Sequence, residues 1–269
     1  MIEPQDFGPV RYYQVDRSIA GRHIISTGVY RIGDLLIDTG PPRCPSFIRQ
    51  VLEDGPVRHL VLTHHHEDHI GNAALVAERC GSTPRIHPLG VPLVARAPTL
   101  PLYRRVVWGT PEPLRARELG EWVETDRYRF RVIHTPGHAV DHVVLHEPDQ
   151  DWLFCGDLYL ADRLRFAFSD EDVGALIGSL RALLAISDCQ MYCQHSGFHR
   201  GHQHRLGRKL DFLLGLRDRA VVHFEEGRTL GEITRALGIH DRFYRFVSGG
   251  DWSGRNLVRG LLRDAGKIH

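Results

Sequence analysis

A chain of 269 residues is long enough for one large domain or for one domain with a small appendage. Hydrophobic residues make up 42% and charged residues 25%, which is typical of an ordinary globular protein and excludes a disordered or fibrous chain. The formal net charge of +1 argues against a dominant non-specific attraction to nucleic acid, and no apolar run is long enough to span a membrane.

The cysteines and the N-terminus bear on the compartment. The five cysteines are scattered and form no Cys-x-x-Cys pair, which favours reduced thiols over a disulfide framework. The first six residues, from Met1 to Asp6, have neither the basic start nor the apolar core of a signal peptide. These features predict a cytoplasmic protein.

The first predicted elements are two strands and a helix. Residues 24–32 and 35–38 are β-like and flank Gly33-Asp34, which predicts a tight hairpin. The second strand ends at Asp38, followed by Thr39 and Gly40. Residues 45–52 place their apolar side chains on one face and predict a helix.

A cluster of histidines and acids follows a short apolar run at residues 59–62, which predicts a buried strand. The cluster then lies on the loop after that strand and comprises His64, His65, His66, Glu67, Asp68 and His69. Imidazole and carboxylate are ligands for zinc, iron and manganese. From the spacing alone we predict only a metal site with two or more histidines and a carboxylate.

The stretch from Pro88 to Glu121 breaks the alternation of strands and helices. Prolines interrupt it at six positions, and it is apolar and aromatic around Trp108. Long irregular segments inside a compact domain are often binding loops. We expect it to cover the metal site and to help hold the substrate; the alternative is a segment packed on the surface.

Further ligand-type residues follow later strands. Residues 128–133 alternate as a half-buried strand and lead to His138 after a Pro-Gly turn. Residues 143–146 and 152–155 predict a strand pair that ends before Asp157. A last strand near residue 191 leads to His195, with His199 as the alternative ligand.

The C-terminal part is predicted to be helical. Ser169 is expected to cap a helix with a leucine stripe, and residues 206–222 suit a long helix. Thr229 and Glu232 fit a capping box, and Ser253 is expected to cap the last helix. We therefore predict a catalytic domain over 1–200 and a C-terminal helical region over 201–269.

The order of His64, His66, Asp68 and His69 resembles the His-x-His-x-Asp-His signature of the metallo-β-lactamase fold superfamily. The resemblance implies an α/β fold, the four-layer αββα sandwich of that superfamily, here with a C-terminal helical appendage. It implies two zinc ions, with iron or manganese as alternatives. The implied metal ligands are, in chain order, His64, His66, Asp68, His69, His138, Asp157 and His195.

Within this resemblance, Asp157 bridges the two metals and Asp68 is the catalytic residue that orients the nucleophile. A metal-bound hydroxide would attack an ester-type bond, a thioester or a lactone, as in hydrolases of the glyoxalase II and lactonase type. The partner is then a small-molecule substrate, with no nucleic acid and no membrane, and a homodimer is left open. The expected substrate contacts are Trp108, Tyr159, Arg163 and Arg165.

Three alternatives remain open at this point. Persulfide dioxygenases share much of the ligand pattern and use one iron. A β-lactam hydrolase is less favoured, because the β-lactamases of the superfamily lack a bridging carboxylate such as Asp157. A metal-sensing or scaffold protein would bind metal without turnover.

Overall fold

The computed structural model describes residues 3–19 and 21–269. Met1 and Ile2, which form part of the N-terminus that predicted no signal peptide, lie outside the described residues. The chain forms two compact units. The first comprises Met1–His134, Asp141–Asp157 and Gln190–His199; the second comprises Thr135–Val140, Leu158–Cys189 and Arg200–His269. The functional division at residue 200 stays a prediction.

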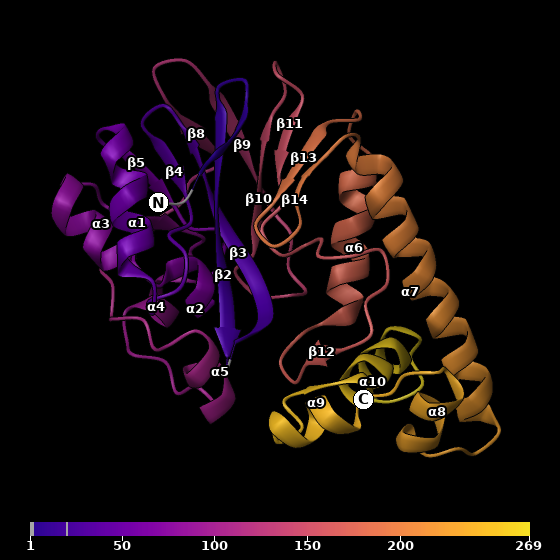
Figure 1. Cartoon of the computed structure of the whole chain (residues 1–269). Helices are drawn as coiled ribbons and strands as arrows, with labels where there is room; N and C mark the ends of the chain where they lie inside the picture. The colour runs from indigo at the N-terminus through magenta and orange to yellow at the C-terminus, as the bar shows by residue number, and fades with distance from the viewer. Residues whose placement is uncertain (1–2, 20) are drawn as a thin grey trace. The chain divides into compact units, whose positions relative to one another are not determined.

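Two sheets form the framework of the first unit (Figure 1). One has seven strands in chain order: β1 Gln5–Phe7, β2 Val10–Ile19, β3 Arg22–Ile32, β4 Leu35–Ile37, β5 His59–Val61, β6 Arg85–Ile86 and β7 Arg117–Glu118. The other has six strands in the order β14-β13-β11-β10-β9-β8. Its strands are β8 Trp122–Glu124, β9 Arg129–His134, β10 Val143–Glu147, β11 Trp152–Phe154, β13 Gln190–Cys193 and β14 Gly197–His199.

The sheets bury a common apolar layer, and helices cover the other face of the seven-stranded sheet. Tyr30 and Ile37 of that sheet belong to one buried cluster with Phe130 and Phe154 of the six-stranded sheet. A second cluster joins the opposite face to two helices, α1 Pro45–Val51 and α3 Ala73–Cys80. The short helices η1 Leu52–Asp54 and α2 Glu67–Ile70 complete this region. The predicted α/β class is confirmed.

The predicted hairpin and the strand before the histidine cluster are confirmed. β3 and β4 pair antiparallel around Gly33, whose positive φ of 58° suits glycine. β4, β5 and β6 then run parallel, so the loop after β5 emerges at the carboxyl edge of the sheet.

The expectation that residues 88–121 form no regular element is wrong in part. The segment contains α4 Val91–Val94, α5 Leu102–Val107 and the strand β7. Its prolines do not break these helices because they stand where helices begin: Pro92 lies in the first turn of α4, and Pro101 is the N-cap of α5.

The second unit is mainly helical. Its helices are α6 Val173–Leu184, α7 His202–Glu225, α8 Leu230–Ala236, α9 Arg242–Val247 and α10 Gly254–Asp264, and the strands β12 Ala167–Phe168 and β15 Trp252–Ser253 pair antiparallel. The capping box at Thr229 and the cap at Ser253 are confirmed. The Ser169 cap is wrong: α6 begins three residues later, because Asp172 accepts the amide of Ala175 (2.9 Å).

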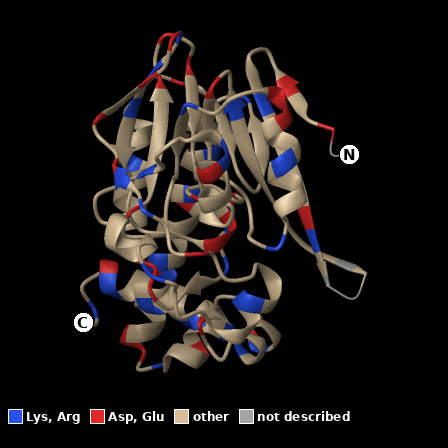
Figure 2. Ribbon diagram, turned by 90° about the vertical axis from the view of Figure 1, so that its left-hand side faces the viewer, with Lys and Arg blue, Asp and Glu red and all other residues tan. Residues whose placement is uncertain are grey.

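Acidic and basic residues are nearly equal in number, 33 and 34, as the net charge of +1 requires. Figure 2 shows the positions of acidic and basic residues interspersed along the ribbon. All five cysteines are free, as predicted. Among the described residues, no helix has the length and apolar character needed to cross a membrane.

Candidate metal centre

The histidine cluster turns inward at the end of β5. His64 and His66 are buried, and their ring centroids lie 4.5 Å apart. His66 still has extended backbone geometry and stands immediately before α2. The first turn of α2 then presents Asp68 and His69, both buried. A strand end followed by a short helix therefore turns four ligand-type side chains toward the interior.

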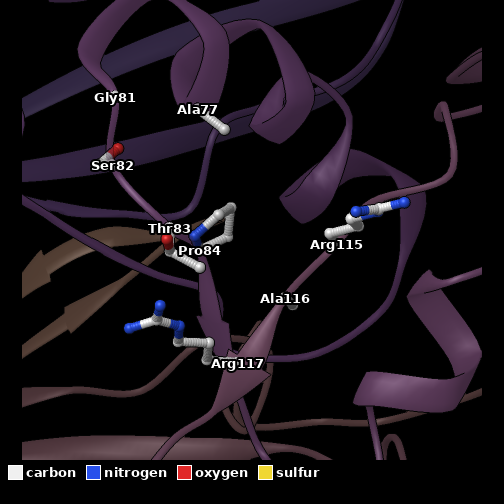
Figure 3. A pocket seen from close by; sticks show the side chains of 8 residues that line it. All are labelled: Ala77, Gly81, Ser82, Thr83, Pro84, Arg115, Ala116 and Arg117. Atoms are coloured by element: carbon white, nitrogen blue, oxygen red, sulfur yellow. The ribbon is translucent and has the colours of Figure 1, made fainter.

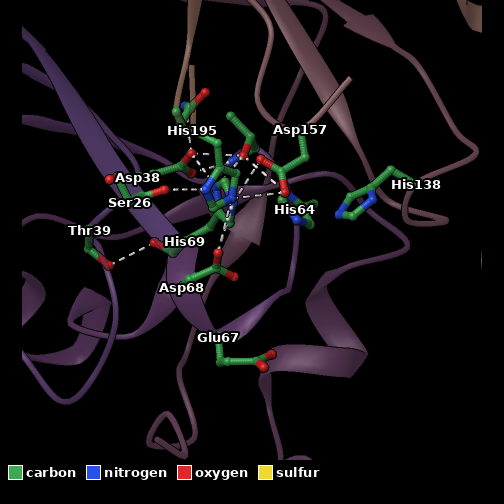
Figure 4. A network of polar contacts seen from close by, with 12 residues as sticks. Ser26, Asp38, Thr39, His64, Glu67, Asp68, His69, His138, Asp157 and His195 are labelled. Carbon is green, nitrogen blue, oxygen red and sulfur yellow. Dashed lines mark hydrogen bonds and ion pairs between the residues drawn. The ribbon is translucent and has the colours of Figure 1, made fainter. Parts of the chain in front are cut away.

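Four residues from three parts of the first unit converge on one point (Figure 4). One ligand-type atom from each lies within 4.8 Å of the others: Asp68, His69, Asp157 and His195. His195 Nε2 lies 3.2 Å from a carboxylate oxygen of Asp68 and 3.2 Å from one of Asp157. His69 Nε2 lies 3.2 Å from the other oxygen of Asp157. These distances allow one ion to contact all four side chains.

The electrostatics of this group favour a cation. Burial lowers the pKa of His195, but the carboxylates of Asp157 and Asp68 outweigh burial and raise it to about 10. The same balance raises the pKa of His69 well above its ordinary value. Burial raises the pKa of Asp157, but the two imidazoles hold it well below its usual range. Two buried carboxylates facing two imidazoles are a donor set that fits zinc, iron or manganese.

Asp38 holds the centre from behind. One carboxylate oxygen accepts from the backbone amide of Thr63 (2.8 Å). The other lies 2.8 Å from the Thr63 hydroxyl, 2.8 Å from His69 Nδ1 and 2.7 Å from Gln194 Nε2. Asp38 has a φ of 64°, a conformation that aspartate and asparagine tolerate better than most residues. It therefore orients His69 and ties two ligand-bearing loops together.

The residue His195 is positioned by groups that the sequence alone did not reveal. Tyr30 and Tyr12 donate from the seven-stranded sheet to the carbonyls of Cys193 (2.8 Å) and Gln194 (2.9 Å). His195 Nδ1 lies 2.5 Å from the Ser26 carbonyl, which directs Nε2 toward the carboxylates. The facing positions of Tyr12 and Tyr30 in the β2–β3 pair follow from strand register, which residue patterns alone did not determine.

Asp157 is also held by its surroundings. Its backbone amide donates to His142 Nε2 (3.0 Å), so His142 acts as a support. Gly156 has a φ of 51°, and a side chain there would meet the His142 ring at 2.5 Å. Only glycine therefore suits the turn that aims Asp157.

His138 belongs to the second unit. Its Nδ1 lies 2.9 Å from Glu171 Oε1, an acid that the sequence did not indicate as a partner. Gly137 precedes it with a φ of 138°, and a Cβ there would clash with Leu176 at 2.4 Å. A carboxylate on Nδ1 fixes the ring orientation of a ligating histidine.

The predicted substrate contacts have different surroundings. Trp108 is buried in the first unit, and its ring centroid lies 6.2 Å from that of His195. In the second unit, the Tyr159 hydroxyl donates to Asp162 (2.6 Å), while Arg163 and Arg165 are exposed. The alternative ligand His199 is hydrogen-bonded to Ser196 (2.9 Å) and is not among the four converging residues.

An ion pair fastens α5 to the ligand loop. Arg104 donates from Nε and Nη2 to the two carboxylate oxygens of Glu67, each at 2.7 Å. Both side chains are buried. Since Glu67 stands between His66 and Asp68, this pair connects the helix before Trp108 directly to the candidate ligands.

A separate hollow of about 430 Å³ lies beside the C-terminal end of α3 (Figure 3). Its lining includes Ser82, Arg115 and Arg117 but no histidine, cysteine or carboxylate. It therefore lacks the donors that a metal centre requires.

Sequence comparison links the chain to known proteins. A sequence model described as the metallo-beta-lactamase superfamily matches residues 29–188. Thioesterase pkgB of Emericella nidulans is 30% identical over 178 residues, covering 64% of this chain and 44% of that protein. A hydroxyacylglutathione hydrolase of Legionella pneumophila is 30% identical over 101 residues, covering 38% of this chain and 33% of the relative. The chain thus spans less than half the length of these two relatives.

Structural comparison tests the fold over nearly the whole chain. A beta-lactamase domain protein from Burkholderia ambifaria aligns with a TM-score of 0.74 and 19% identity. The alignment covers 99% of this chain and 91% of that one. This likeness supports the predicted fold class, C-terminal helices included.

Proposed function

Because the chain belongs to the metallo-β-lactamase superfamily, we propose that it is a metal-dependent hydrolase of a small-molecule ester-type bond, a thioester before a lactone. The observation that carries this proposal is the buried convergence of Asp68, His69, Asp157 and His195. The names of the two curated relatives, a thioesterase and a hydroxyacylglutathione hydrolase, support the thioester.

The residues divide into two ligand groups. His64 and His66, with His138 from the second unit, would hold one ion. Asp68, His69 and His195 would hold the other, and Asp157 would lie between the two. Zinc is the proposed metal, and iron or manganese suits the same donors. When bound, such ions supply a water activated for attack near neutral pH and a Lewis acid for the carbonyl oxygen.

The side chains of the protein then orient and protect the reaction. Asp68, held 3.2 Å from His195 Nε2, is placed to orient the attacking water and accept its proton. Trp108 would form an apolar wall beside His195 and keep bulk water from the thioester. Tyr159 would donate to the substrate after leaving Asp162, and Arg163 and Arg165 would hold an anionic leaving group. These contacts, a cytoplasmic location and a homodimer are parts of the proposal.

The test is hydrolysis by the zinc-loaded full chain on four substrates: a thioester, a homoserine lactone, a β-lactam and a phosphodiester. His66→Ala and Asp157→Ala serve as ligand variants, and His23→Ala, an exposed histidine of β3, serves as the control. We expect thioester turnover that both ligand variants lose and the control retains. No turnover of any substrate in protein that holds its metal would contradict the proposal. Iron content with oxygen consumption on a persulfide would instead support the dioxygenase alternative.

A further inference from the structure

An open hollow of about 460 Å³ in the second unit gathers positive charge. It is formed by α9, the turn after it and the start of α10. Four of its nine lining residues are arginines, and none is acidic: the arginines are Arg242, Arg245, Arg255 and Arg259. This hollow has no part in the proposed hydrolysis, and a binding role for it does not depend on that function.

None of the four arginines of the hollow is paired with an acidic side chain in the described residues. Asp241 and Asp251 lie close in sequence, but they bond to the Gly254 amide (3.1 Å) and the Ser169 hydroxyl (2.6 Å). None of the ion pairs found among residues 3–19 and 21–269 includes any of the four arginines. Three of them, Arg245, Arg255 and Arg259, are half-buried, so solvent screens their mutual repulsion less than on an open surface. An anion bound in the hollow would relieve that repulsion.

Hydrogen bonds order part of the lining of the hollow. Asn256 Nδ2 donates to the carbonyls of Gly250 (3.0 Å) and Asp251 (2.8 Å), which fixes the turn between α9 and α10. Arg259 Nη1 donates to Asn256 Oδ1 (3.1 Å), which orients one guanidinium. Gly249 and Gly250 add no side chain, and no atom lies within 4 Å of the Cβ position at either. The turn and the Arg259 guanidinium are therefore ordered before a ligand binds.

The lining indicates the chemistry of the ligand. Guanidinium groups match the oxygen geometry of phosphate with paired hydrogen bonds. Phe246 also lines the hollow, and it is 87% exposed. An exposed aromatic ring is accessible for stacking against a planar group. We propose that this hollow binds a small phosphorylated ligand with an aromatic base, of the nucleoside diphosphate class.

Calorimetry on the zinc-loaded full chain tests the proposal, with ADP, pyrophosphate and adenosine as separate probes. We expect ADP to bind more tightly than either part. Arg245→Gln with Arg259→Gln should weaken ADP binding at least tenfold. The matched control is Arg263→Gln, on α10 but outside the hollow, and it should bind ADP as the parent does. Arg242→Gln should also weaken ADP binding, and because Arg242 is exposed, this substitution should not disturb folding.

Two further variants separate the sources of binding. Phe246→Ala should weaken ADP but not pyrophosphate, since only ADP has a base to stack. Asp157→Ala should leave ADP binding unchanged, which excludes phosphate held by the metal centre. Thioester turnover should be equal in the arginine variants and the parent, so failure of this site is distinct from failure of the hydrolase.

Several results would overturn the inference. Equal ADP affinity in the arginine variants and Arg263→Gln would show that the hollow is not the site. If pyrophosphate binds as tightly as ADP, the hollow does not recognise an aromatic base. Absence of ADP binding, with sedimentation on phosphatidylserine vesicles that depends on Phe246, would make this face a membrane contact instead.

Discussion

At the scale of single residues, Asp38 forms hydrogen bonds with both loops that carry candidate metal ligands, the loop after β5 and the loop after β13. Its carboxylate accepts from Thr63 at the start of the histidine cluster and from Gln194 just before His195. It also orients His69 through Nδ1. In the sequence, Asp38 only ends a predicted strand, because its four hydrogen bonds depend on how β4, β5 and β13 are arranged in the folded chain.

We predict that Asp38→Asn lowers zinc affinity about 10- to 100-fold, the range typical of groups that orient metal ligands. Asparagine keeps the shape and tolerates the positive φ, but its amide group presents a donor where the partners of Asp38 are donors. Competition with a zinc indicator measures the change. Asp151→Asn is the control, because Asp151 has a φ of 53° and lies in an exposed turn. Equal zinc affinity in Asp38→Asn and the parent would contradict this role.

At the scale of elements, α5 is fastened to the rest of the first unit by arginines. Arg104 pairs with Glu67, Arg17 Nε donates to the Val107 carbonyl (2.7 Å), and Arg43 Nη2 donates to the Arg105 carbonyl (2.9 Å). These bonds hold the helix that precedes Trp108. Trp108, whose ring centroid lies 6.2 Å from that of His195, therefore follows a helix that is anchored within the first unit.

We predict that Arg104→Ala lowers the free energy of unfolding by about 3–5 kcal/mol, because it leaves the buried Glu67 carboxylate without its cation. Urea unfolding followed by circular dichroism measures the loss. Arg105→Ala removes an exposed arginine from the same helix and should change stability by less than about 0.5 kcal/mol. A loss in Arg104→Ala no larger than in Arg105→Ala would show that the pair contributes little.

The strand pair β2–β3 makes stability sensitive to alkaline pH. Burial raises the pKa of Tyr12 and of Tyr30 above the ordinary 10.0. The unfolded chain therefore loses these protons first, and stability that is full below pH 10 falls as the pH rises above 10. Each tyrosine contributes a slope of about 1.4 kcal/mol per pH unit. Urea unfolding between pH 9 and 11 should show a shallower slope for Tyr30→Phe; an unchanged slope would contradict this assignment.

Local patterns predicted most elements, and tertiary contacts explain the differences. The capping box at Thr229 was predictable because it involves residues three positions apart. The N-cap of α6 was not, because Asp172 is as good a capping residue as Ser169 and is the one that caps the helix. At the site, ligand-type residues could be recognised from their types and order. Glu171, Arg104 and the two tyrosines could not, because each meets its partner across at least 33 positions of the chain.

At the scale of the whole molecule, bound metal should stabilise the fold. Asp68 and Asp157 are buried carboxylates, and although burial raises their pKa values, His69 and His195 hold both below the ordinary range, so both acids carry the negative charge that a metal ion binds. A ligand that binds only the folded state adds about 4 kcal/mol at a concentration about 1,000 times its dissociation constant. We predict that chelation lowers the melting temperature by several degrees and that zinc restores it. Asp157→Asn should reduce the difference in melting temperature between the zinc-loaded and the chelated protein. A melting temperature that does not change on chelation would argue against a metal centre.

The most direct test is to titrate the metal-free protein with zinc while following bound zinc and thioester turnover in the same samples. We predict binding that ends at two zinc ions per chain, turnover that depends on both, and no turnover in Asp157→Ala. Thioester hydrolysis in the metal-free protein, or full zinc loading without hydrolysis of any ester-type substrate, would contradict the assignment of a metal-dependent hydrolase.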